Sequence, residues 1–79
     1  MGTVTAAEPK YPTKRQVTGV WKAWRLTPDA DLWEMAEAVG RSKTFVGDAL
    51  ARRGTAKLTL PELEKIAEII RAHGGKVTI

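Results

Sequence analysis

The chain has 79 residues, and its 13 Lys and Arg against 9 Asp and Glu give a formal net charge of +4 at pH 7. This length allows one small domain and excludes two. The absence of Cys excludes disulfides, thiolate chemistry and zinc sites built on cysteine. No apolar run approaches the roughly 18 residues of a membrane span, so we expect a soluble cytoplasmic protein.

The beginning of the chain differs from the rest. Residues 1–12 lack a helical period and contain two of the four prolines, which predicts a flexible basic N-terminal tail. Residues 13–79 form the predicted domain. We expect an all-α fold, a compact four-helix domain with a short C-terminal β-strand.

The first two helices are predicted from apolar spacing and from residues that cap or end helices. The first begins after Thr13, and the Thr27-Pro28 step ends it because a residue before proline avoids the helical conformation. Its predicted buried residues are Val17, Val20, Trp21 and Trp24. Asp31 is the expected N-cap of the second helix, Glu34 would complete a capping box, and Gly40 ends the helix. The predicted buried stripe of this helix is Leu32, Met35, Ala36 and Val39.

The third and fourth helices follow the same pattern. Ser42 is the expected N-cap of the third, and residues 52–57 form a loop after it. Thr59 opens the fourth helix with Glu62 as its capping-box partner, and Gly74-Gly75 end it. The residues predicted to face the core are Val46, Ala49 and Leu50 in the third helix and Leu63, Ile66, Ala67 and Ile70 in the fourth.

The last four residues, 76–79, alternate polar and apolar side chains, which predicts a short strand. An unpaired strand edge can join a second copy of the same chain. We therefore expect a homodimer in which the contact is made by Val77, Thr78 and Ile79.

Positive charge is concentrated in two segments. Residues 10–25 hold five basic and no acidic residues, and residues 41–57 hold five basic residues against Asp48 alone. The second segment includes the third helix, which follows a tight turn. Two helices joined by a three-residue turn with glycine form a helix-turn-helix.

The run Met35–Val46 carries Ala36 where two helices cross, Gly40 at the reversal and Val46 as a plug. With this run and the segment 58–67, the chain resembles the Cro/lambda-repressor-like (XRE-type) helix-turn-helix domains over roughly residues 14–73. The motif itself spans 31–52. Departures from the family pattern are Arg41 in the turn, the small Ala49, a longer connection after the third helix, and Gly47 within that helix.

The resemblance implies a small bacterial or phage transcriptional regulator that binds an inverted repeat in double-stranded DNA as a dimer, represses by occlusion and is associated with the nucleoid. The third helix would then lie in the major groove. The residues expected to contact bases are Lys43, Thr44, Phe45, Gly47 and Asp48. Phe45 has a second possible role, covering the edge of the core. The residues expected to contact phosphates are Arg41, Ser42, Arg52, Arg53, Lys57, Lys14 and Arg15.

The alternatives to this function are an enzyme, a protein–protein module and a non-specific architectural DNA coat, which would bind with little sequence preference. An enzyme finds little support, because the single serine, Ser42, already serves as an N-cap and no phosphate-binding loop precedes a helix. We expect no catalysis, no metal and no cofactor. The main alternative is a protein–protein module on the same scaffold, either antitoxin-like or a phage-encoded inhibitor of a host protein. Asp48, Gly47 and Trp33 favour it, although Trp33 also suits a partly buried packing role.

Overall fold

Four helices follow one another in the computed structural model, which describes residues 10–79. They are α1 (Lys14–Arg25), α2 (Leu32–Val39), α3 (Lys43–Ala51) and α4 (Leu60–Ala72). The prediction of an all-α chain with four helices is confirmed, whereas residues 1–9 of the predicted tail lie outside the described part. None of the helices in the described part is long and apolar enough to cross a membrane.

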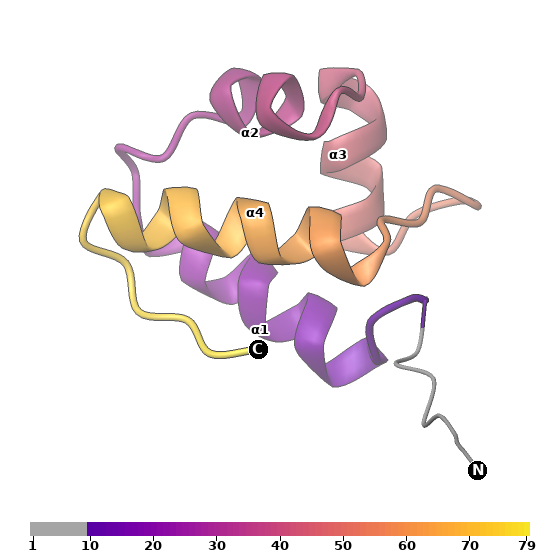
Figure 1. Ribbon diagram of the computed structural model, residues 1–79, viewed down its shortest axis with the longest axis horizontal. Helices are drawn as coiled ribbons and strands as arrows, with labels where there is room; N and C mark the ends of the chain where they lie inside the picture. The colour runs from indigo at the N-terminus through magenta and orange to yellow at the C-terminus, as the bar shows by residue number, and fades with distance from the viewer. Residues whose placement is uncertain (1–9) are drawn as a thin grey trace, which may run out of the picture.

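The helices pack around one apolar core. Helices α1 and α2 each contact both α3 and α4, and Figure 1 shows α4 between α2 and α1 with α3 running crosswise at one end. The largest fully buried side chains are Val20, Met35, Val46, Leu50, Leu63, Ile66 and Ile70. Every one of these residues was predicted to face inward, since apolar spacing determines which face of a helix is removed from water.

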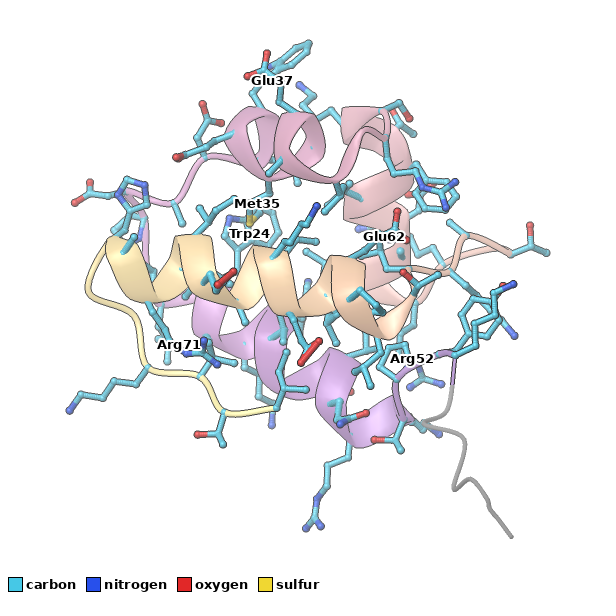
Figure 2. The ribbon with its side chains drawn as sticks, in the orientation of Figure 1. Trp24, Met35, Glu37, Arg52, Glu62 and Arg71 are labelled. Atoms are coloured by element: carbon cyan, nitrogen blue, oxygen red, sulfur yellow. The ribbon has the colours of Figure 1, made fainter. Side chains whose placement is uncertain are left out.

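The tryptophans of α1 are half-buried and pack against this core. The indole Nε1 of Trp24 donates a hydrogen bond of 3.0 Å to the carbonyl oxygen of Ala30, in the loop that leads to α2. Trp24 and Met35 lie between the ribbons of α2 and α4 in the view of Figure 2. Trp24 therefore satisfies its single polar atom while it contributes apolar surface to the core.

Three of the predicted N-caps are confirmed. Asp31 accepts from the Trp33 amide, Ser42 accepts from the Phe45 amide, and Thr59 forms the expected capping box with Glu62. The box predicted for Glu34 is wrong. Its Oε1 lies 3.0 Å from Nε2 of His73 at the end of α4, so this carboxylate joins two helices instead of capping its own.

The predicted C-terminal strand is also wrong, because residues 76–79 form no strand in the described chain. Gly74, at φ 89°, turns the backbone, and the side-chain Nε of Arg71 donates to the carbonyl oxygen of Val77 at 2.9 Å. Val77 and Ile79 are half-buried against the protein's own core, and Thr78 is exposed. The alternating pattern reflects packing against helices, so the dimer contact proposed for residues 77–79 loses the strand edge on which it depended.

Candidate functional site

The turn between α2 and α3 is short and sharply defined. Gly40 ends α2 in the left-handed conformation, with φ 70° and ψ 32°, as predicted. The amide of Arg41 donates to the carbonyl oxygen of Ala36 at 3.0 Å, and Ser42 then caps α3. These bonds satisfy the backbone groups at both helix ends, so α3 leaves α2 in a fixed direction, crosswise to it (Figure 1).

The outer face of α3 carries small and polar side chains. Val46, Ala49 and Leu50 are buried, and the opposite side of the helix carries Thr44, which is exposed, and Asp48, which is half-buried. Gly47 is half-buried on the flank of α3 that faces α2. A Cβ at Gly47 would meet only Leu32 Cδ2, at an ordinary contact distance of 3.6 Å. Packing within the chain therefore does not require glycine at this position.

Two cation–aromatic contacts surround the beginning of α3. The ammonium of Lys43 lies 4.8 Å from the centre of the Trp33 ring, and the guanidinium of Arg41 lies 4.7 Å from the centre of the Phe45 ring. Trp33 is 65% exposed, so it does not take the partly buried packing role considered for it. Phe45 is half-buried and packs against the core.

Arg41 is fixed by a contact with α4. Its Nε donates to Oε2 of Glu62 at 2.9 Å, and this hydrogen bond raises the pKa of the guanidinium above its ordinary value. Partial burial acts to raise the pKa of Glu62, but hydrogen bonds from Arg41 and Thr59 outweigh it and hold the pKa below the usual value. Arg41, predicted to contact phosphate, is thus engaged within the protein.

At its other end, α3 stops at an arginine in an unusual conformation. Arg52 has φ 58° and ψ 43°, and it is the only residue other than glycine with a positive φ in the range 10–79. The Arg53 amide donates to the carbonyl oxygen of Asp48 at 2.8 Å, which completes the turn. Both arginine side chains are exposed. A glycine usually occupies the left-handed position after a helix, because other L-residues are strained there.

A cavity of about 320 Å³ lies between the beginning of α1, the end of α3 and the loop before α4. It brings together three cations predicted as phosphate contacts from separate segments, Lys14, Arg52 and Lys57. Arg15 and Arg53 are exposed but do not line it. Figure 2 shows Arg52 toward the same end of the molecule as Glu62, with Arg71 toward the other end.

Tyr11 also lines this cavity, although the sequence places it in the tail. The Leu60 amide donates to the carbonyl oxygen of Lys10 at 2.9 Å, which holds this segment against the beginning of α4. The lone aromatic residue between Lys10 and Pro12 is the one signal in the sequence for such a contact. Prolines on either side of it obscured that signal.

The described residues contain no group of three or more His, Cys, Asp or Glu able to hold a metal ion. Comparison of the chain with models of known protein families, with curated proteins and with solved structures finds no match. The surface of α3 and the cations around it are the features of the described residues that bear on function.

Proposed function

We propose that the protein binds double-stranded DNA in a sequence-specific manner, with α2 and α3 acting as a helix-turn-helix and α3 lying in the major groove. It would repress transcription by occlusion, as a small regulator of bacterial or phage origin. The observation that carries this proposal is the surface of α3. Short side chains line its outer face, and exposed cations stand at both of its ends, namely Lys43, Arg52 and Arg53.

A major-groove reader needs a helix that can approach base edges closely and cations that meet the phosphates on either side. Thr44 adds little bulk to the outer face of α3. Gly47 adds none to the flank of the helix that faces α2, and packing within the chain does not require glycine there. Asp48 is the opposing charge on this face, and it has a role if it accepts a hydrogen bond from cytosine N4. Lys43, in the first turn of α3, is the candidate for guanine.

The proposal takes a twofold dimer on an inverted repeat as the binding form. The first experiment is selection of the full chain against a random pool of duplex DNA at near-physiological salt, followed by sequencing. Recovery of half-sites about one helical turn apart is the expected result. Enrichment of no sequence would contradict specific binding.

Charge reversal tests where the DNA lies. Arg52→Glu with Arg53→Glu should abolish binding to the selected site, because two phosphate-facing cations become anions. The matched control is Lys22→Glu with Lys76→Glu, which changes the net charge equally. Both control residues are exposed and belong to neither α2 nor α3: Lys22 is in the last turn of α1, and Lys76 is in the segment after α4. Equal loss in the two variants would contradict the placement on α3.

The exposed Trp33 favours a second candidate, the protein–protein module. Tryptophan is enriched at the centres of protein interfaces, and at 65% exposure this ring covers none of the core. The two candidates respond to different changes. If a protein partner is the target, Trp33→Ala removes binding to that partner, while the Arg52/Arg53 charge reversal leaves it intact. If DNA is the target, the charge reversal removes binding to DNA, while Trp33→Ala leaves it intact.

A further inference from the structure

The cavity beside Arg52 combines positive charge with a lining that is partly polar and partly apolar. Lys14, Arg52 and Lys57 surround it, and no acidic residue lines it. The contacts between a basic side chain and a carboxylate within residues 10–79 are Arg41 with Glu62 and His73 with Glu34, so none of these three cations is neutralised by a carboxylate in the described chain. Like charges brought together in this way favour an anion between them.

The lining argues for more than a simple ion. The apolar surface of the cavity comes from side chains that are not fully buried, namely the exposed Tyr11 and the half-buried Pro12, Val17 and Ala56. A hydrated inorganic ion gains nothing from such a surface, whereas an apolar group placed on it leaves water favourably. The volume, about 320 Å³, is at the small end of the range for ligand sites.

We propose that this cavity binds a small organic anion with an apolar body, such as an aromatic carboxylate or phosphate monoester, and that the bound anion competes with DNA for Lys14, Arg52 and Lys57. The second half of this statement rests on the proposed DNA binding, and the first half does not. Arg52 ends α3 and lies against the cavity at the same time. An anion held there withdraws cations from the phosphates, so it acts as an inducer that releases the DNA.

The binding half is tested on the full chain by titration calorimetry with phenyl phosphate, which combines an anion with one ring. Inorganic phosphate and phenol, the two halves of this probe, are measured alongside. We expect phenyl phosphate to bind at least about tenfold more tightly than either, because only it uses both the cations and the apolar lining. If inorganic phosphate bound as tightly as phenyl phosphate, the proposal would be overturned, because only the cations and not the apolar surface of the cavity would contribute to binding.

Variants locate the binding. Lys57→Gln should weaken phenyl phosphate by about tenfold, the usual cost of losing a hydrogen bond to a charged group. Lys22→Gln, on the exposed side of α1 and outside the cavity, should leave the affinity unchanged. Ala56→Phe should block the cavity; because that change could also disturb folding, the exposed Lys57 carries the test. Equal effects of Lys57→Gln and Lys22→Gln would overturn the assignment.

The regulatory half is read from DNA binding with and without phenyl phosphate, at constant ionic strength. A lower affinity in phenyl phosphate than in an equal concentration of inorganic phosphate supports competition, and an unchanged affinity overturns it. The two proposals fail in different ways. Binding of phenyl phosphate with no selected DNA sequence would remove the DNA function and leave the anion site, whereas selected DNA with no phenyl phosphate binding would remove the site alone.

Discussion

Arg41, in the turn before α3, is joined to Glu62, in the first turn of α4, by a contact of 2.9 Å between Nε and Oε2. The same Glu62 accepts a hydrogen bond from the Thr59 amide through its other oxygen, Oε1. One carboxylate therefore belongs to the capping box of α4 and also holds the side chain of Arg41, in the turn before α3. The ionised form of Glu62 thus strengthens the contact between this turn and α4.

The substitution Glu62→Gln separates these two tasks. Glutamine keeps one acceptor oxygen for the Thr59 amide, but its NH2 group stands where Oε2 accepted from Arg41 and cannot accept a hydrogen bond. The charge and the hydrogen bond opposite Arg41 are therefore lost together. Because the folded-state pKa of Glu62 is lowered, its charge stabilises the fold fully above the unfolded-state value of about 4.3, and this contribution is lost as the pH falls through the lower folded value. We expect the variant to be slightly less stable than the parent at pH 7 and equal to it at acid pH.

Guanidinium unfolding curves at pH 7 and near pH 3 measure this difference for both proteins. Guanidinium chloride is itself a salt and screens the ion pair between Arg41 and Glu62. Thermal unfolding at low salt therefore serves as the second measurement. A stability difference that stays constant across this pH range would contradict the role given to the charge of Glu62.

The C-terminal segment depends on a glycine at position 75. A Cβ there would lie 2.5 Å from Thr27 Oγ1 and 2.9 Å from the carbonyl oxygen of Ile70. Thr27 is buried and donates its hydroxyl to Ala23, so it cannot easily move. Gly75→Ala should therefore lower the free energy of unfolding by about 1–3 kcal/mol.

Gly19→Ala is the matched control for this change. A Cβ at position 19, within α1, would have no atom within 4 Å, so the variant should gain about 0.5–1 kcal/mol from helix propensity. Chemical denaturation of both variants gives the comparison. If Gly75→Ala were as stable as the parent, the C-terminal segment would not be held tightly between α1 and α4.

Features that depend on neighbours in sequence were predictable. Asp31, Ser42 and Thr59 cap helices through bonds to amides two or three residues away, and such bonds follow from residue type and spacing alone. Gly40 was predictable as well, because glycine readily adopts the left-handed conformation that ends a helix. The apolar period likewise identified the core, because it records which side of each helix faces inward.

Contacts between distant segments were not predictable. Glu34 has a capping-box position in the sequence, yet it meets His73, 39 residues away. The alternation in residues 76–79 suggested a strand, but a pattern this short also suits an extended segment packed on helices. Lys14, Arg52 and Lys57 were identified singly as cations, and only the packing of α1 against α3 brings them to one cavity.

Replacing Arg52, which is in the left-handed conformation, should have opposite effects on the stability of the fold and on the affinity for DNA. Arg52→Gly removes the strain of a side chain at φ 58° and should raise the free energy of unfolding by about 1 kcal/mol. Arg53→Gly also loses one cation but lacks the positive φ. It should lower the stability by about 0.4–1 kcal/mol, because glycine adds freedom to the unfolded chain.

Both arginine variants should bind DNA more weakly than the parent, since each loses one candidate phosphate contact. Thermal unfolding and DNA titration are measured on the same samples. We expect Arg52→Gly to be more stable than the parent and Arg53→Gly to be less stable, while both bind DNA more weakly. A stabilised Arg52→Gly protein with full DNA affinity would show that Arg52 serves neither the fold nor the binding.

Base reading and phosphate contact are separated by substitutions at the two ends of α3. Lys43→Ala should weaken the preferred site by about 1–3 kcal/mol and relax the preference at one base position. Arg53→Ala should weaken all sequences alike and make the dependence of log affinity on log salt shallower by about one unit. Lys65→Ala, an exposed change on α4, is the control. If both the Lys43 and the Arg53 variants lost as much affinity for unrelated sequences as for the preferred site, α3 would contact the DNA phosphates and would not enter the major groove.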